Sequence, residues 1–142
     1  MSYSISLVDP VSRETLQLDS PHQMQGSAYA VGGTCDAWLD ITYNYARWYR
    51  KDGVFPGKDE DGGSLGIQAI YGLSGADSIP VITQAIHALE GMEDGLTEEE
   101  IRKFKDNGAS GYWLPTRANA IRPLYQLLAL AKLRPDGVWK GD

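Results

Sequence analysis

The stretch from Thr34 to Lys51, TCDAWLDITYNYARWYRK, constrains the fold more than any other segment. At about 100° per residue, its apolar side chains cover more than half of a helix circumference, which predicts one amphipathic helix. An apolar arc of this width needs neighbours on at least two sides, so we expect this helix at the centre of the fold. Thr34 would be its N-cap, and Asp36 would lie in the first turn, where the helix dipole favours a negative charge. The apolar set consists of Cys35, Trp38, Leu39, Ile41, Thr42, Tyr45, Ala46, Trp48 and Tyr49.

The last third of the chain predicts the second half of the core. Residues from Asn119 to Leu133 are apolar around most of a helix circumference. Either Thr116 or Asn119 is a suitable N-cap, and Pro123 fits only close to the helix start, because a proline deeper in a helix costs about 3 kcal/mol. We expect this helix and the Thr34–Lys51 helix to form the core pair.

The N-terminal segment carries the strand signals. Residues 3–18 alternate as a β-hairpin should, with a turn that begins at Val8-Asp9-Pro10. Asp19-Ser20-Pro21 ends the hairpin, because proline cannot donate to a ladder. One more short strand is predicted near residues 28–31. Two or three strands are only marginally stable alone, so we expect them to lie against the central helix, and Trp139 to pack back onto this core.

The middle of the chain predicts a loop and a helix. The glycine-rich segment 52–66 is expected to be a mobile surface loop, because its composition cannot bury enough apolar area to offset the entropy of ordering it. A helix follows, with Asp77 or Ser78 as its cap, Pro80 in its first turn and Gly91 at its end.

A further short helix begins at a capping box. Thr97 is followed three residues later by Glu100, which predicts a polar helix that ends near Asp106. Taken together, these patterns predict an α+β fold in a single domain over residues 1–142, with an N-terminal β-hairpin or small antiparallel sheet packed on three to four helices.

Charge and composition limit the classes of function. The formal net charge is −6 and the pI is near 4.8, which argues against direct binding to a nucleic-acid backbone, since that needs a basic face. The single cysteine, Cys35, excludes an internal disulfide, favours a reducing compartment, and is interpreted as a small core residue. No apolar run reaches the roughly eighteen residues of a membrane span, and the N-terminus has no signal-peptide pattern. We therefore expect a cytoplasmic protein without membrane contact.

Metal-binding and catalytic patterns do not emerge from the sequence. His22 and His87 lack the short spacing of a zinc site. Asp59-Glu60-Asp61-Gly62 matches part of a calcium loop, but Gly57 and Gln68 then occupy the end positions that need carboxylates. We predict no metal, no cofactor and no catalytic residue, and a non-enzymatic protein is favoured over an enzyme.

The turn Gly72–Ser78, which includes Ser74, offers a second interpretation. Backbone N–H groups at a helix start can hold an anion, with Arg47 or Arg117 as a clamp. The chain would then be a small nucleotide-binding protein or enzyme. The spacing matches neither the dinucleotide fingerprint nor the phosphate-binding loop of nucleotide hydrolases, so an ordinary capped turn is favoured.

Aromatic, amide and arginine side chains at two places predict a binding surface, because such residues are enriched where proteins recognise partners. The predicted partner is a protein or a small anionic ligand, and a third interpretation is a homo-oligomer formed through the aromatic connector 111–116. The candidate residues are Tyr43, Asn44 and Arg47 on the exposed strip of the central helix, and Trp113, Thr116, Arg117 and Asn119 around that connector.

Four segments give the chain a family resemblance. They are AWLDITYNY (37–45), GIQAIYGLSGADSIPV (66–81), YWLPTRANA (112–120) and QLLALAKLRPDGVWKGD (126–142). In these segments the chain resembles uncharacterised small proteins of bacterial phages and other mobile elements, and 57–64 looks like an insertion relative to that pattern. The resemblance implies an accessory protein that meets a host or rival defence system, and it assigns no catalytic residue.

Overall fold

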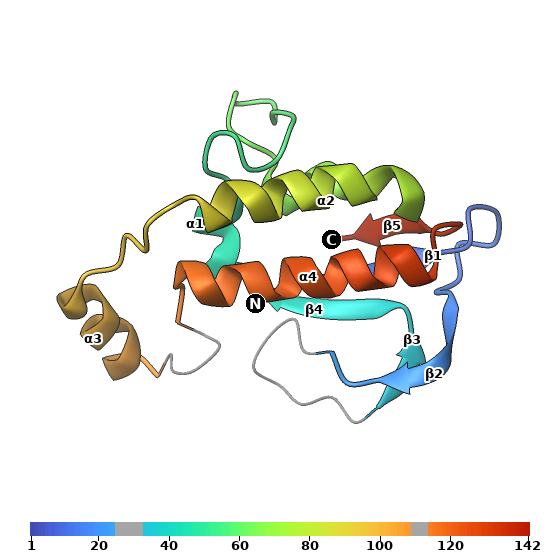
Figure 1. Cartoon of the computed structure of the whole chain (residues 1–142), viewed down its shortest axis with the longest axis horizontal. Coiled ribbons are helices and arrows are strands. Elements are labelled where there is room, and N and C mark those ends of the chain that lie inside the picture. The colour runs from blue at the N-terminus through green and yellow to red at the C-terminus, as the bar shows by residue number, and fades with distance from the viewer. Residues whose placement is uncertain (25–32, 109–113) are drawn as a thin grey trace.

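The computed structural model describes residues 1–24, 33–108 and 114–142 (Figure 1). Its main sheet is antiparallel and has three strands in the order β4-β1-β5. Strand β1 (Ser2–Val8) is central and pairs with β4 (Trp38–Thr42) on one side and with β5 (Val138–Gly141) on the other. Together with the helices described below, this sheet confirms the predicted α+β class.

The prediction of an N-terminal hairpin over residues 3–18 is wrong except for one bridge next to the turn. Val8 forms an isolated bridge with Thr15, but the returning strand β2 (Gln17–His22) pairs with β3 (Thr34–Asp36) in a separate two-stranded sheet. The physical reason is that both edges of β1 are already paired with β4 and β5. The strand predicted near 28–31 lies outside the described residues.

The predicted central helix is also wrong. The segment forms β3, β4, a 3-10 turn η1 (Tyr43–Tyr45) and a single helical turn α1 (Ala46–Tyr49). The spacing of its apolar residues fits the two-residue repeat of a strand as well as the repeat of a helix. The segment forms strand β4 because it pairs with β1. In β4 the core-facing residues Leu39 and Ile41 are buried, whereas Trp38, Asp40 and Thr42 are half-buried on the other face.

The change from helix to strand alters the surroundings of several predicted core residues. Tyr45 and Tyr49 are buried as expected, but Trp38 is only partly covered. Cys35 lies half-exposed in β3 and is not part of the core. The continuous polar strip that was predicted along one helix therefore does not exist.

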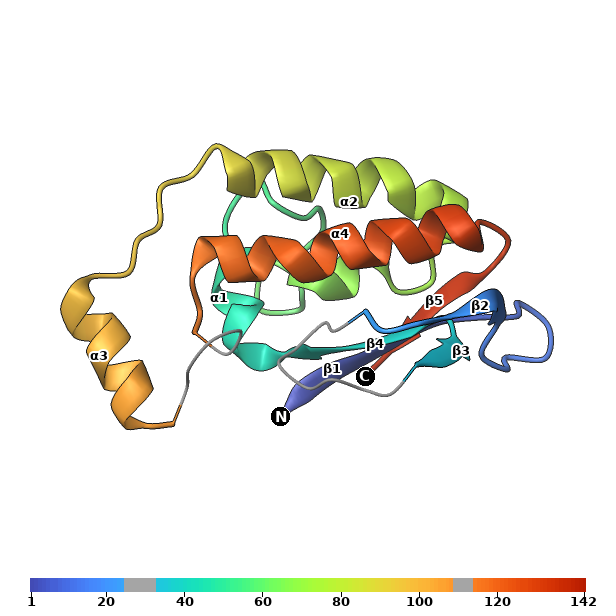
Figure 2. The same cartoon turned by 60° about the horizontal axis from the view of Figure 1, so that its bottom comes forward.

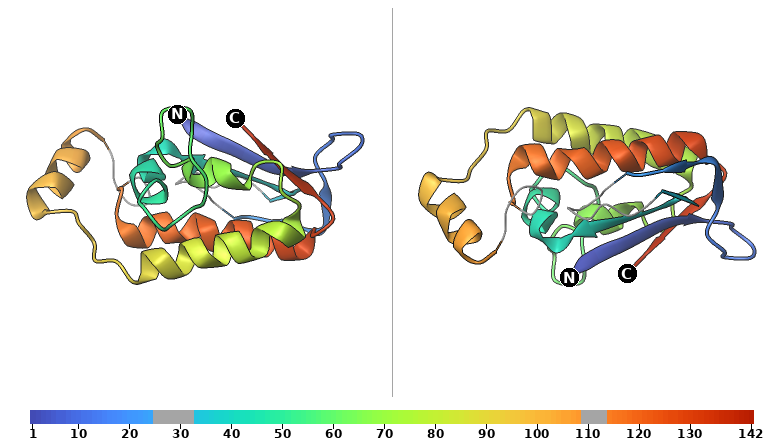
Figure 3. Two further views of the ribbon diagram at one scale, coloured as in Figure 1. Left: turned by 90° about the horizontal axis from the view of Figure 1, so that it is seen from above. Right: turned by 90° about the horizontal axis from the view of Figure 1, so that it is seen from below.

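The helical core pair consists of α2 (Gly75–Glu90) and α4 (Arg117–Leu133). Figures 2 and 3 show these helices side by side over one face of the main sheet. One continuous core contains Tyr3, Ile5 and Leu7 of β1 together with apolar residues of both helices and of β5. Trp139 in β5 is buried, which confirms that the C-terminal tail packs back.

Local capping signals were predicted with mixed success. Thr116 caps α4, Thr97 caps α3 (Glu98–Asp106), and Gly91 ends α2, all as expected. The cap of α2 is Ser74, whose Oγ accepts the N–H of Asp77 at 3.0 Å, and neither Asp77 nor Ser78 caps the helix. The two prolines that were expected near helix starts, Pro80 and Pro123, lie inside their helices beyond the first turn.

Two segments depart from the compact core. Helix α3 stands apart from the other elements (Figure 1), and none of its residues is buried. In the glycine-rich segment 52–66, Val54 and Phe55 are buried in the core, while residues 56–63 are exposed. A short 3-10 helix η2 (Gly66–Ile70) then leads to α2. The mobility expected of the segment stays a prediction, and it applies to the exposed residues.

Candidate functional site

The turn that begins α2 uses its backbone donors within the protein. The N–H of Gly72 donates to the carbonyl of Trp139, and those of Gly75 and Ala76 donate to the carbonyls of Gly137 and Pro135. The N–H groups of Asp77 and Ser78 both bind Ser74, at its Oγ and its carbonyl. The turn is thus fastened to the C-terminal segment, and these amides are not available to an anion.

The proposed arginine clamps do not reach that turn. Arg117 Nη1 donates to the carbonyl of Leu89 at 3.4 Å, next to the C-terminal end of α2. The turn lies at the opposite end of this 16-residue helix, about 24 Å away. Arg47 instead lies 4.0 Å from Glu100 of α3. The geometry therefore argues against an anion site built from Ser74 and either arginine.

The first predicted surface group is divided between two elements. Tyr43 begins η1, and its ring packs edge-on against Tyr3 with a centroid separation of 4.5 Å. Asn44 is exposed beside it, and Arg47 lies on α1, where it forms the ion pair with Glu100. Tyr43 and Arg47 thus make contacts with different elements, β1 and α3.

The second predicted group mainly organises the start of α4. Thr116 Oγ1 accepts the N–H of Asn119 at 3.2 Å, and the Asn119 amide donates to the carbonyl of Leu114 at 3.1 Å. The guanidinium of Arg117 lies where the α2 dipole favours a positive charge. Trp113 and the first half of the connector 111–116 lie outside the described residues.

Buried hydrogen bonds join the two groups. Trp48 Nε1 of α1 donates to the carbonyl of Pro115 at 2.7 Å, and the Tyr49 hydroxyl donates to the carbonyl of Ala120 at 2.7 Å. The structure thus brings the predicted residues of α1 and α4 near one another. Since these contacts are internal, they fix the position of α4 and do not form a recognition surface by themselves.

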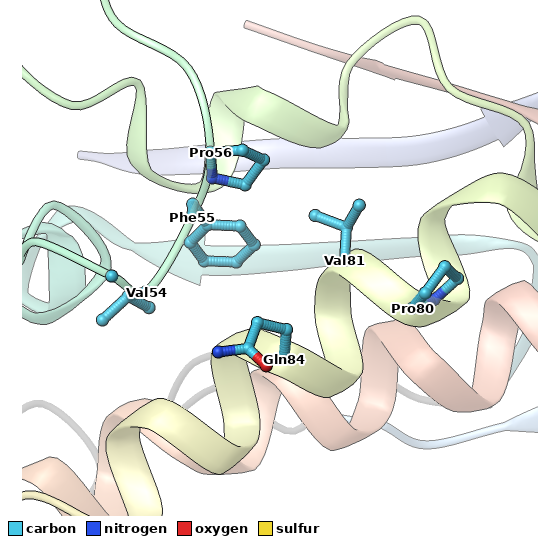
Figure 4. A pocket seen from close by; sticks show the side chains of 7 residues that line it. Val54, Phe55, Pro56, Pro80, Val81 and Gln84 are labelled. Carbon is cyan, nitrogen blue, oxygen red and sulfur yellow. The ribbon is translucent and has the colours of Figure 1, made fainter.

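A different place offers a concave surface. A hollow of about 370 Å³ opens between the loop after α1 and one side of α2 (Figure 4). Its wall on the loop side is held by packing, because the buried ring of Phe55 meets the ring of Tyr49 edge-on at 6.1 Å. Its residues are Gly53, Val54, Phe55 and Pro56 from the loop, and Pro80, Val81 and Gln84 from α2.

The chemistry of this hollow is apolar. Gln84 supplies the one polar side chain among its lining residues, and none of the lining side chains is titratable. Two prolines, Pro56 and Pro80, give parts of the wall a restricted backbone. Figure 4 shows Phe55 and Val81 reaching the hollow from the loop and from α2, with Gln84 farther along the helix. Such a surface suits an apolar group and offers nothing for acid–base chemistry.

Two phenols with raised pKa values, those of Tyr49 and Tyr71, have partners within the protein. Burial raises the pKa of Tyr49 well above its usual value, and partial burial together with the nearby Asp142 raises the pKa of Tyr71. The Tyr49 hydroxyl binds the carbonyl of Ala120, and that of Tyr71 binds the carbonyl of Asp142 at 3.2 Å. Neither phenol is placed to exchange a proton with a ligand in the hollow.

Among the described residues, no helix is both long and apolar enough to span a bilayer. Within those residues, no group of three or more histidine, cysteine or acidic side chains is arranged to hold a metal ion.

Comparison with known proteins finds no match to this chain among family models, curated proteins or solved structures. Its function must therefore be argued from its own geometry. The sequence does not point to this hollow, because Val54-Phe55-Pro56 lies within a glycine-rich segment that is typical of a surface loop. The sequence signal for it is this apolar triplet between two glycines, Gly53 and Gly57.

Proposed function

We propose that the chain is a non-enzymatic binding protein that engages a protein partner through the hollow between Phe55 and Val81. One apolar side chain of the partner enters the hollow, and Gln84 at its edge donates or accepts a directing hydrogen bond. The observation that carries this proposal is an apolar concavity of about 370 Å³ with a single polar side chain in its lining.

The physics of interfaces supports this mode of binding. A few anchors that fill pockets provide most of the affinity of a typical interface. A rigid wall reduces the entropy lost on binding, and here the wall includes Pro56, Pro80 and the packed ring of Phe55. The lining lacks the set of convergent polar groups that orients most small ligands, which favours a side chain of a protein over a free metabolite.

The context of the protein is part of the same proposal. Its resemblance to small proteins of phages and mobile elements suggests a partner from a bacterial host or a rival defence system. We place the encounter in the cytoplasm, in accord with the single cysteine.

Co-purification from a bacterial host lysate tests the proposal. The baits are the wild-type chain, Val81→Asp and Pro56→Asp, each with a thermal melt to verify folding. Ala76→Asp is the matched control, because Ala76 is exposed on α2 but does not line the hollow. We expect a partner that the wild type and the control retain and both hollow variants lose. Retention by all four baits would contradict the proposal.

A further inference from the structure

The face of the main sheet that points away from α2 and α4 has a polar character. Strand β1 directs Tyr3, Ile5 and Leu7 into the core, so its serines alternate onto the other face. Ser4 is exposed there, and Ser6 is half-buried. This surface is separate from the apolar hollow on α2.

A second hollow, of about 290 Å³, lies on this open face. Its lining includes two cations and three hydroxyl groups, together with one carboxylate. These groups belong to Arg13, Lys140, Ser4, Ser6, Thr15 and Asp142. Segments from both ends of the chain thus contribute to it.

Strand register explains how these groups meet. Ser6 of β1 lies directly opposite Lys140 of β5, so their side chains project from the same face as neighbours. Val8, two residues farther along β1, pairs with Val138 on one side and bridges to Thr15 on the other. The Thr15 hydroxyl is therefore brought to the same end of the hollow by the chain reversal at residues 9–14.

That reversal holds Arg13 in an uncommon conformation. Arg13 is the one non-glycine residue with positive φ in the described part of the chain, at φ 65°. Its N–H donates to the carbonyl of Asp9 at 2.9 Å, and the N–H of Asp9 donates to the carbonyl of Glu14 at 2.8 Å. The Asp9 carboxylate accepts the N–H groups of Val11 and Ser12, which closes the turn. Residues with large side chains rarely adopt left-handed backbone conformation. Where they do, the position is often part of a functional site.

The donors of this hollow have few partners in the protein. Across the described residues, neither Arg13 nor Lys140 takes part in an ion pair, and the hydroxyls of Ser6 and Thr15 have no hydrogen bond. Ser4 Oγ accepts the indole N–H of Trp38 at 2.8 Å, which leaves its own O–H to donate. The opposing charge is Asp142, and one of its carboxylate oxygens accepts the N–H of Ser4 at 2.9 Å.

We propose that this second hollow binds a phosphate group. Arg13 and Lys140 supply two positive charges beside the side-chain carboxylate of Asp142, and the hydroxyls of Ser4, Ser6 and Thr15 supply neutral donors. Guanidinium and ammonium groups combined with hydroxyls are the donor set that proteins use for tetrahedral oxyanions. The phosphate can be free in solution or part of a small organic monoester, since both present the same oxygens.

Nuclear magnetic resonance titration with sodium phosphate at constant ionic strength tests this proposal on the full chain. We expect saturable shifts of the backbone amide signals of Ser6, Thr15 and Lys140. Lys140→Gln should weaken binding about tenfold, which corresponds to about 1.4 kcal/mol. Arg13→Gly should weaken it similarly while keeping a residue that tolerates the positive φ. Lys132→Gln, on an exposed position of α4, is the matched control and should bind as the wild type does.

A parallel titration with ribose 5-phosphate distinguishes the two sources of the group. Equal affinity for both compounds identifies a site for the free anion, and tighter binding of the ester identifies a site for a monoester. The proposal is overturned if the shifts do not saturate, if sodium chloride produces the same shifts, or if the Lys140 and Arg13 variants bind phosphate as the wild type does.

Discussion

The indole Nε1 of Trp139 donates a hydrogen bond of 2.7 Å to the hydroxyl of Ser78, and this contact joins β5 to α2 within the core. Ser78 is fully buried, and its hydroxyl donates in turn to the carbonyl of Gly75 at 2.8 Å. The C-terminal strand is therefore fixed to the first turn of α2 by a chain of satisfied polar groups.

Replacement of Ser78 should reveal the energetic importance of this chain. In Ser78→Ala the buried indole N–H loses its acceptor, and we expect a loss of about 1–3 kcal/mol in the free energy of unfolding. Trp139→Phe combined with Ser78→Ala removes both partners, so the double variant should be more stable than the sum of the two single losses implies. Urea denaturation of the four proteins measures this coupling, and strictly additive losses would contradict it.

Gly75 allows the close approach of α2 to the segment before β5. A Cβ at this position would lie 2.6 Å from the carbonyl oxygen of Arg134 and 3.0 Å from Cα of Pro135, and both are backbone atoms. Gly75→Ala should therefore lower the unfolding free energy by about 1–3 kcal/mol through overpacking. Gly95→Ala is the matched control, because a Cβ there meets nothing within 4 Å. Equal unfolding free energies of Gly75→Ala and Gly95→Ala would contradict a tight contact between α2 and the segment before β5.

Tyr49 predicts how stability depends on alkaline pH. Burial raises the pKa of its phenol well above that of the unfolded chain, which is about 10. Below pH 10 both states hold the proton, and above it only the folded state does, so stability falls as the pH rises. We expect Tyr49→Phe to reduce this decline by up to about 1.4 kcal/mol per pH unit. Denaturation of the wild type and of Tyr49→Phe at several values between pH 9 and 11 measures the effect. Equal slopes for wild type and Tyr49→Phe would contradict it.

At neutral pH the same substitution tests a contact between elements. Tyr49→Phe removes the hydrogen bond to the Ala120 carbonyl, which ties α1 to α4, and should cost about 0.5–1.5 kcal/mol. If Tyr49→Phe leaves the free energy of unfolding at pH 7 unchanged, this hydrogen bond contributes little to the contact between α1 and α4.

Elements with local signals were predictable from the sequence. Thr97 and Thr116 cap α3 and α4 because a hydroxyl before a helical pattern satisfies a free N–H of the first turn. The prediction of a helix over 34–51 was wrong because its local pattern does not select one structure. Leu39 and Ile41 fit both a helix and a strand, and the choice depends on β1, which lies more than thirty residues earlier in the chain.

The candidate sites depended on tertiary contacts even more strongly. Ser74 replaces Asp77 as the cap of α2 because the C-terminal segment accepts the N–H groups of Gly75 and Ala76. Likewise, no sequence pattern places Pro56 beside Val81, or Arg13 beside Lys140, since each pair is brought together only by the folding of distant segments. Residue types could be recognised from the sequence, but their juxtaposition could not.

Photo-crosslinking at the edge of the α2 hollow tests the central claim most directly. His87 is exposed on α2 one turn beyond Gln84 and does not line the hollow, so its replacement by p-benzoylphenylalanine places a reactive group beside a bound partner and keeps the lining intact. Lys132, exposed on α4 and outside the hollow, is the matched control position. In a bacterial host lysate we predict one discrete protein adduct from position 87 that disappears when Val81→Asp is added. Adducts that are the same from both positions, or that persist with Val81→Asp, would contradict the account.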